Sequence, residues 1–199
     1  MPSKALNKHN IVDFIFDLFS RRGAEEYLGE SVSMAQHMEQ TAACAVADAA
    51  ADSLVASALL HDIGHFVGDF PIDALEKGVD NLHEEAGAQF LAPWFPVSVT
   101  EPIRLHVAAK RYLCKTDEGY FDRLSAASVN SLRVQGGPMN AGEVRQFESS
   151  PYYRDAVKAR LYDDDGKIAG LTIKPVREYR KLLESLLLDQ ANDGDAELN

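Results

Sequence analysis

The stretch Leu59-Leu60-His61-Asp62-Ile63-Gly64-His65 is the most informative part of this sequence. It places ionisable side chains directly after the apolar run that extends from Val55 to Leu60. A buried helix that ends in charged groups needs a partner for them, because an unpaired charge is costly to bury. A metal ion is the simplest partner for a histidine that is followed at once by an aspartate.

Five of the six histidines form one spaced series with two aspartates. A single histidine is more often an ordinary core or surface residue than a ligand, so the series as a whole carries the argument. Imidazoles and carboxylates bind first-row transition metals, and this series holds more of them than one ion needs. We therefore predict a two-metal site, with the ligands His37, His61, Asp62, His83, His106 and Asp163.

Asp62 is the predicted bridge between the two ions. Consecutive residues at a helix end point about 100° apart, so His61 can serve one ion while the two oxygens of Asp62 reach both. Four imidazoles favour iron, manganese, zinc or cobalt over magnesium, which prefers oxygen ligands. Ligand chemistry alone leaves these four ions open, with iron first.

The composition is that of an ordinary globular protein, with 46% apolar and 26% charged residues among 199. We expect one domain over residues 1–199, with frayed ends at 1–8 and 190–199. The polar N-terminus and the interruptions at Asp13 and Asp17 fit neither a signal peptide nor a membrane span, so we expect a cytoplasmic protein. Cys44 and Cys114 follow no metal or redox spacing and are expected to be reduced thiols.

The formal net charge of −11 argues against nucleic acid as the main partner, because such proteins gather Lys and Arg against the phosphate backbone. A small anionic substrate is still compatible with a local basic pocket. Neither a membrane partner nor a particular oligomeric state is predicted.

Helical periodicity dominates and no run of alternating strand residues is found, so the predicted fold class is all-α. Cap residues support several helix starts: Asn10, Ser98 with Glu101, Asn140 with Glu143, Ser150-Pro151, and Pro175. Asp163 to Lys167 is predicted to be a turn. Helices are predicted at Ile11–Phe19, Ser33–Ala51, Ser53–His61, Leu82–Leu91, Ser98–Tyr112, Asn140–Phe147, Tyr152–Tyr162 and Val176–Leu188. Successive helices then each bring a ligand to one centre, as in metal-binding bundles.

The spacing His37, His61-Asp62, Asp163 resembles the signature of the HD-domain superfamily, an all-helical fold best known for metal-dependent phosphohydrolases. His83 and His106 resemble the two-metal branch of that superfamily. With three further blocks the chain is similar to the PhnZ-type mixed-valent diiron oxygenases, which cleave the C–P bond of 1-hydroxyphosphonates. The resemblance covers roughly Glu25 to Leu186. The three blocks are Tyr27-Leu28-Gly29-Glu30, His106 to Leu113, and Gln135-Gly136-Gly137-Pro138-Met139.

This resemblance implies two iron ions in a mixed Fe2+/Fe3+ state. One would be held by His37, His61, Asp62 and Asp163, and the other by Asp62, His83 and His106. Tyr27 would occupy the second iron until substrate displaces it, and Glu30, one helical-turn step away, would face a cationic nitrogen of the substrate. His65 would serve as acid or base. The implied phosphonate contacts are His65, Lys110, Ser128, Ser131, Gln135 and Arg160.

The residues alone support part of this assignment. Arg160 and Asp163 are three apart on a helix end and can face one centre, and an arginine fork suits phosphonate oxygens. Ser128 and Ser131 fit a turn or a helix cap equally well. Without the resemblance, Tyr27 is predicted to be a core residue.

The expected function is a dioxygenase that converts 1-hydroxy-2-(trimethylammonio)ethylphosphonate and O2 to glycine betaine and phosphate, with no external reductant. Glu30 and the aromatic faces of Tyr27, Phe66 and Phe70 favour the quaternary ammonium group. One alternative is the same reaction on 2-amino-1-hydroxyethylphosphonate, giving glycine. Another is a metal-dependent phosphohydrolase of a nucleotide or phosphate ester. A third is a non-catalytic sensor of a phosphorylated metabolite.

Overall fold

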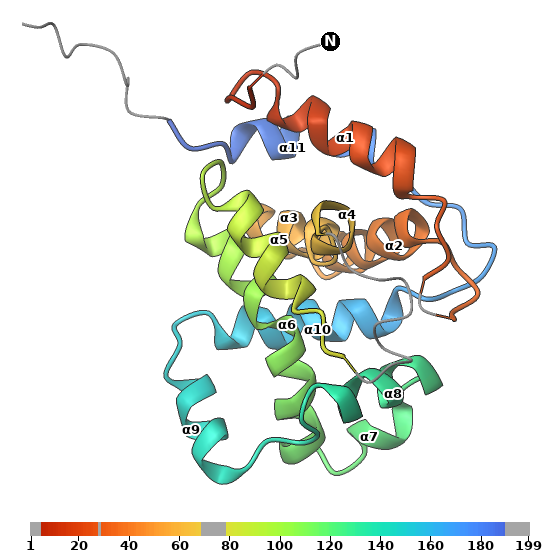
Figure 1. Cartoon of the computed structure of the whole chain (residues 1–199), viewed down its shortest axis with the longest axis vertical. Coiled ribbons are helices and arrows are strands. Elements are labelled where there is room, and N and C mark those ends of the chain that lie inside the picture. The colour runs from red at the N-terminus through yellow and green to blue at the C-terminus, as the bar shows by residue number, and fades with distance from the viewer. Residues whose placement is uncertain (1–4, 28, 69–78, 190–199) are drawn as a thin grey trace, which may run out of the picture.

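The computed structural model describes residues 5–27, 29–68 and 79–189. Leu28, Phe70 and the predicted frayed residues 1–4 and 190–199 lie outside the described part. Within these ranges the regular structure is helical, apart from an isolated β-bridge between Glu26 and Ser33 (Figure 1). The all-α prediction is therefore confirmed. No helix of the described residues is both long and apolar enough to cross a bilayer.

Eleven α-helices and one 3-10 helix are found in the described residues. Their bounds are α1 (Ile11–Arg22), α2 (Met34–Ala47), α3 (Asp52–Leu60), α4 (Gly64–Val67), α5 (His83–Leu91), α6 (Val97–Thr116), α7 (Tyr120–Arg123), α8 (Ala126–Val134), α9 (Ala141–Glu148), α10 (Tyr153–Asp165), η1 (Val176–Tyr179) and α11 (Arg180–Ser185).

Every predicted helix is present with shifted ends, and the capping box of Asn140 with Glu143 is confirmed. Three helices were not predicted: α4, α7 and α8 are short or lack an apolar stripe, and α8 buries only Leu132 among its apolar residues. The box predicted at Ser98 is wrong, because α6 already starts at Val97 and Glu101 accepts hydrogen bonds from Arg104.

Two further local predictions need correction. Asn10 takes the N-cap position of α1, but its side chain makes no cap hydrogen bond and accepts instead from the backbone N–H of Asn7. The turn predicted at residues 163–167 is wrong, because α10 continues through Asp165 and the next turn is at residues 169–170. The longer helix places Asp163 on the same face as Arg160, one turn further along, where the two side chains hydrogen-bond.

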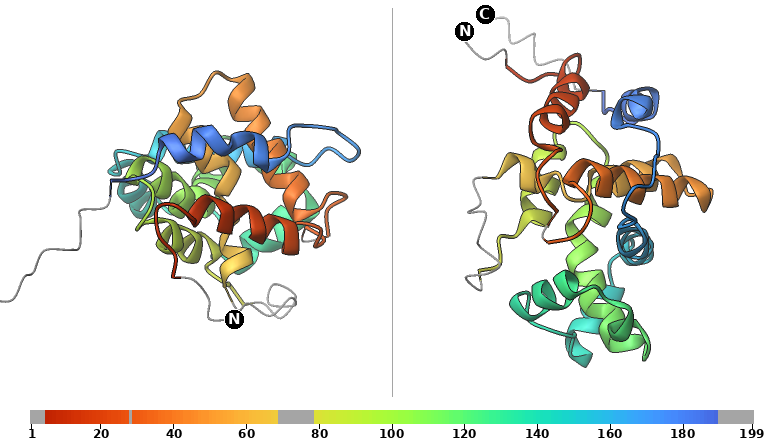
Figure 2. Two further views of the ribbon diagram at one scale, coloured as in Figure 1. Left: turned by 90° about the horizontal axis from the view of Figure 1, so that it is seen from above. Right: turned by 90° about the vertical axis from the view of Figure 1, so that its right-hand side faces the viewer.

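The helices form three tiers along the long axis of the molecule (Figures 1 and 2). Helices α1 and α11 pack together at one end, and α7, α8 and α9 lie at the other. The middle tier holds α2, α3, α5, α6 and α10, which make the most extensive contacts with one another. These helices supply the predicted metal ligands.

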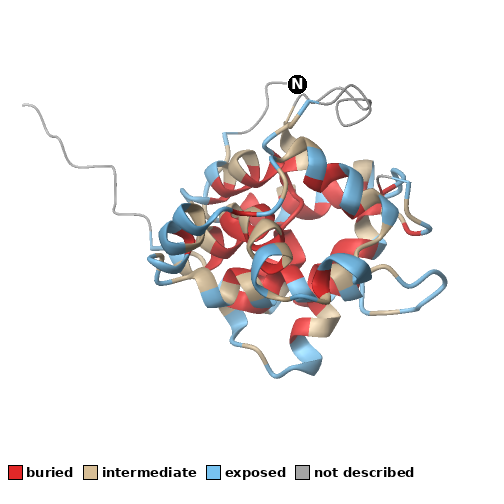
Figure 3. Ribbon diagram, turned by 90° about the horizontal axis from the view of Figure 1, so that it is seen from below, coloured by how far each residue is buried: buried red, intermediate tan, exposed pale blue. Residues whose placement is uncertain are grey.

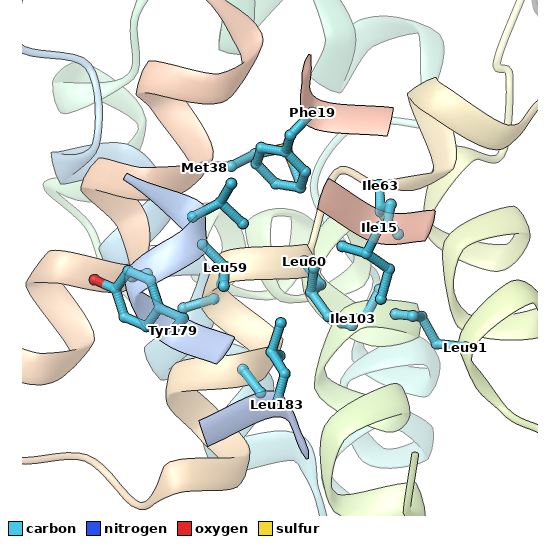
Figure 4. Packing of buried hydrophobic residues seen from close by; sticks show 14 of the residues in the cluster. Ile15, Phe19, Met38, Leu59, Leu60, Ile63, Leu91, Ile103, Tyr179 and Leu183 are labelled. Atoms are coloured by element: carbon cyan, nitrogen blue, oxygen red, sulfur yellow. The ribbon is translucent and has the colours of Figure 1, made fainter. Parts of the chain in front are cut away.

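Buried residues line the inward-facing sides of the helices (Figure 3), and helix α3 contributes to the hydrophobic core along almost its whole length (Figure 4). All its residues from Leu54 to Leu60 are buried, and Leu59 and Leu60 pack among side chains such as Met38, Ile63 and Ile103. A helix that is apolar all round is surrounded by other elements. Because α3 ends inside the protein, the residues that follow it, His61 and Asp62, are delivered to the interior.

Two glycines allow α4 and α5 to approach each other. A Cβ on Gly64 would lie 1.8 Å from the carbonyl oxygen of His83, and one on Gly87 would lie 3.1 Å from the backbone nitrogen of Gly64. The absence of both side chains brings the start of α5 against the His61-Asp62 segment.

Candidate metal centre and substrate pocket

The six predicted ligands meet in the interior, where all are buried. They come from α2, the α3–α4 connection, α5, α6 and α10. Two groups of three place their ligand atoms within 4.8 Å of one another: His37, His61 and Asp62, and Asp62, His83 and His106. Asp62 belongs to both groups, as the sequence analysis expected for a bridge.

The two oxygens of Asp62 face different histidine pairs. Oδ2 lies 3.2 Å from Nε2 of His61 and 3.7 Å from Nε2 of His37. Oδ1 lies 3.2 Å from Nε2 of His83 and 3.6 Å from Nε2 of His106. One carboxylate can therefore serve two adjacent metal positions.

Asp163 completes the first group. Its Oδ1 is buried 3.4 Å from Nε2 of His37 and 3.2 Å from Nζ of Lys167, while its Oδ2 accepts from Nη1 of Arg160 at 2.6 Å. Oδ1 thus forms an ion pair with Lys167 but makes no hydrogen bond. It also faces the first group of ligands, where a carboxylate oxygen suits a metal ion.

The four histidines turn their Nδ1 atoms outward to hydrogen-bond acceptors. His37, His61 and His106 meet the backbone carbonyls of Gly166, Ala58 and Ile103 at 2.7–2.9 Å. His83 meets Oδ1 of Asn81 at 3.0 Å. A partner on Nδ1 fixes the tautomer that leaves the Nε2 lone pair for a metal. All four Nε2 atoms face the centre.

The charge state of the centre also fits a cation. Burial lowers the pKa of His37 to about 4, and it lowers that of His106 well below the usual range. Burial opposes ionisation of Asp62, but His61 and His83 hold the pKa of this carboxyl well below its usual range. Burial also opposes protonation of His61 and His83, but Asp62 outweighs it and raises the pKa of both imidazoles. Transition metals bind ionised carboxylates and neutral imidazoles, so a bound ion would take the place of the protons that Asp62 attracts to these two rings. The donor set therefore fits two metal positions.

A pocket opens beside the second group and includes all eight predicted substrate residues. Three of them, Glu30, His65 and Gln135, have a buried polar atom without a hydrogen-bond partner. The remaining predicted residues in its wall are Tyr27, Lys110, Ser128, Ser131 and Arg160, and sequence analysis missed Asn81, Val107, Ala127 and Lys167.

Positive charge gathers at the α6–α8–α10 side of the pocket. The buried Nζ of Lys110 donates to Oγ of Ser131 at 2.7 Å, and burial and the neighbouring Arg160 lower the pKa of Lys110 to about 7. Lys167 lies 3.3 Å from Oγ of Ser128 and 3.2 Å from Oδ1 of Asp163. Both ammonium groups border the pocket and suit an anionic ligand.

Comparison with known proteins gives three relatives of nearly full length. The [1-hydroxy-2-(trimethylamino)ethyl]phosphonate dioxygenase (glycine-betaine-forming) of Leisingera caerulea is 49% identical over 182 residues, which cover 92% of this chain and 93% of the relative. The hydroxymethylphosphonate dioxygenase of Gimesia maris is 42% identical over 88% of each chain. An uncharacterized protein, L432, of Acanthamoeba polyphaga mimivirus is 32% identical over 92% of this chain and 84% of its own length. Residues 30–127 match the HD domain model.

The chain belongs to the HD-domain phosphonate dioxygenase family. The family resemblance drawn from its histidine series and local blocks is thereby confirmed. Metal binding by the enzyme is supported jointly by the family and by the buried histidine and carboxylate groups.

In this phosphonate dioxygenase, Tyr27 covers the first group of ligands. Its ring stacks on His37 with centroids 3.8 Å apart, and its hydroxyl is within hydrogen-bonding reach of Asp62. Burial and the negative charge of Asp62 raise its pKa. Glu30 is not a helical step away, as the sequence suggested, but lies in a turn in which its N–H donates to the carbonyl of Tyr27 at 2.7 Å. Both side chains still reach the pocket.

The structure does not support the roles predicted for Phe66 and Arg160 in substrate binding. Phe66 does not border the pocket: its ring packs edge-on against Phe19 and lies under the guanidinium of Arg22. It is therefore a core residue. Arg160 borders the pocket, but its guanidinium already binds Asp163, Asp164, Ser128 and Tyr120, so its fork is not free for two phosphonate oxygens.

His65 stacks on His83 with ring centroids 4.2 Å apart. Burial, and then the charge of His83, lower its pKa to about 3. At neutral pH it is an uncharged imidazole, which suits a hydrogen-bonding role better than that of a general acid.

Proposed function

We propose that this enzyme cleaves the C–P bond of 1-hydroxy-2-(trimethylammonio)ethylphosphonate with O2, giving glycine betaine and phosphate. It is an oxidoreductase that incorporates O2, with a small phosphonate as its other reactant. The observation that carries the proposal is the 49% identity, over almost the whole chain, to an enzyme named for this conversion. The pocket supports it, because it has cations on one side and the carboxylate of Glu30 in its wall.

Iron fits the donor set, and we propose a pair of ions in the mixed Fe2+/Fe3+ state. His37, His61, Asp62 and Asp163 would hold one ion, and Asp62, His83 and His106 the other. The bound pair would supply the redox chemistry through which O2 accepts electrons from the substrate.

The protein orients the substrate by charge. Lys110 and Lys167 would neutralise the phosphonate, with the amide of Gln135 donating a further hydrogen bond. Ser131 would act by holding the ammonium group of Lys110, because its own hydroxyl already donates to the carbonyl of Ser128. Arg160 would act mainly by fixing Asp163 and Ser128, which it already contacts. The unpaired Oε1 of Glu30 would face the trimethylammonium group. These contacts would place the hydroxyl-bearing carbon beside His83 and His106, which border the same pocket.

Tyr27 and His65 border the same space. We propose that Tyr27 guards the second metal position until substrate arrives. Its ring stacks on His37 of the first group, but its hydroxyl interacts with Asp62, the carboxylate that both groups share. The partnerless Nε2 of His65 would hydrogen-bond the substrate hydroxyl or a phosphonate oxygen.

The reaction balances without a reductant. One substrate dianion and one O2 give a carboxylate, one hydrogen phosphate and one proton. The C–P bond breaks, the hydroxyl-bearing carbon is oxidised to the carboxylate, and O2 is reduced. No electron donor other than the substrate is consumed.

The relatives favour this function over the hydrolase and sensor alternatives, because two of them are named as phosphonate dioxygenases. The amine substituent needs a direct test, since Glu30 attracts a primary ammonium as well, and Phe66 gives no aromatic contact. The experiment compares kcat/KM of iron-loaded protein in air for three substrates: the trimethylammonio compound, its primary-amine analogue, and hydroxymethylphosphonate. We expect the trimethylammonio compound to have the highest value. An equal or higher value for either other substrate would contradict the proposal.

The cytoplasmic location stays a prediction.

A further inference from the structure

The outward partners of the four ligand histidines are not equivalent. Three of the Nδ1 atoms meet backbone carbonyls within helices or at a helix end, which the fold holds in place. His83 alone among the four meets a side chain, that of Asn81. A side chain can be replaced without a change in the backbone, so this contact can be removed by substitution.

Asn81 makes two bonds to the same residue. Its Oδ1 accepts from the backbone N–H of His83 at 3.3 Å and from Nδ1 of the ring at 3.0 Å. The first bond satisfies an N–H at the start of α5, where helices have unpaired donors. The second fixes the imidazole plane. One oxygen therefore couples the start of the helix to the direction in which Nε2 points.

The backbone between the two residues is strained to permit this contact. Leu82 has φ +48° and ψ +40°, a left-handed conformation that side chains other than glycine seldom adopt, and its side chain is 53% exposed. Such a conformation is unfavourable for a leucine and persists where surrounding contacts enforce it. Here it turns the chain so that Asn81 points back at His83.

Glu84 does not replace this contact. Its Oε2 lies 3.5 Å from Nδ1 of His83 and has no hydrogen-bond partner. Asn81 also borders the substrate pocket, whereas Glu84 does not. The ring of His83 is thus oriented from the pocket side by Asn81.

We propose that Asn81 is a positioning residue that selectively controls the metal position formed by Asp62, His83 and His106, and leaves the position of His37, His61 and Asp163 unaffected. The inference rests on the proposed two-metal centre. Loss of an outer hydrogen-bond partner typically weakens metal binding by roughly 10- to 100-fold. The effect should fall on one of the two positions only.

The test is anaerobic titration of full-length, metal-free protein with Fe2+, with metal per chain and both dissociation constants measured by calorimetry. Wild type should bind two ions. N81A should bind the first with unchanged affinity and the second roughly 10- to 100-fold more weakly. N81D keeps an oxygen at the same place and should retain both ions. N140A removes another helix-capping asparagine, at α9, and should also bind two ions.

The possible results separate the two proposals. Fewer than two ions in wild type would contradict the dinuclear centre itself, whatever Asn81 does. Two ions in N81A at wild-type affinity would overturn the role of Asn81. Equal losses of affinity at both metal positions in N81A would also overturn it, because Asn81 contacts only one of the ligand histidines. The same loss in N81D as in N81A would overturn it too, because N81D keeps the oxygen that accepts from His83. Circular dichroism of each variant verifies that the helices are intact.

Discussion

Gly64 packs against the backbone of His83 so closely that a Cβ on Gly64 would lie 1.8 Å from the His83 carbonyl oxygen. The contact joins the segment that carries Asp62 to the helix that begins with His83. Since the obstructing atom belongs to the backbone, no side-chain rotation can relieve the overlap, and α4 and α5 must move apart.

We therefore expect G64A to separate Asp62 from His83. Overpacking of this kind costs typically about 1 to 3 kcal/mol of the free energy of unfolding. Thermal unfolding and iron content per chain measure the two effects, and both should fall. G119A is the matched control, because a Cβ there meets the far end of the Arg123 side chain at 3.1 Å, and that side chain can rotate away. Unchanged iron content in G64A would contradict this role for the close approach.

Glu30 should distinguish cationic from neutral substrates. E30Q keeps the shape of the side chain but removes the charge that faces the ammonium group. A trimethylammonium group has no N–H, so its contact with Glu30 is charge attraction, which amounts to about 3 kcal/mol for unit charges roughly 5 Å apart at an effective dielectric constant of about 20. Since the glutamine of E30Q keeps part of the attraction through its amide dipole, kcat/KM for the trimethylammonio substrate should fall by roughly 10- to 100-fold. Activity on hydroxymethylphosphonate, which has no amine, serves as the internal control and should change little. Equal losses on both substrates would show that Glu30 does not recognise the cation.

Lys110 should make phosphonate binding depend on pH. Burial and Arg160 lower its pKa from the ordinary 10.5 to about 7 in the folded protein. The ammonium is thus present below pH 7 and lost as the pH rises through it. Binding of an anion by this group should weaken in the same direction, so KM should increase above about pH 7.

K110R separates this effect from ionisation of the substrate itself, because a guanidinium stays protonated across the whole range. The ratio of the wild-type KM to that of K110R, measured between pH 6 and 9, should increase with pH. A ratio that stays constant would show that Lys110 does not titrate in this range or does not bind the phosphonate.

Sequence patterns predicted which histidines and aspartates meet in the interior, because a metal site restricts both residue type and chain position. His37, His61 and Asp62 follow the order of the helices that hold them, and an apolar α3 could only end inside the protein. The position of Asn81 was not predictable in the same way, since its role depends on the left-handed backbone at Leu82.

Proximity in sequence does not predict the role of a residue where the direction of its side chain decides that role. Phe66 follows the metal motif by a few residues, but α4 turns its ring toward Phe19 and the core. Arg160 was expected to be free for substrate, yet the continuation of α10 past Asp163 supplies Asp164 as a further partner. Lys167 was missed because it follows the helix in a stretch predicted only to be a turn.

The most direct test of the central claim is phosphate release from 1-hydroxy-2-(trimethylammonio)ethylphosphonate by iron-loaded protein, in air and under strict anaerobiosis, with O2 consumption recorded in parallel. We expect phosphate and glycine betaine in equal amounts, one O2 consumed per phosphate, and no release without O2. H83A, which removes a ligand of the second position, should be inactive in the same assay. Phosphate release that continues at the same rate without O2 would contradict the account and establish a hydrolase.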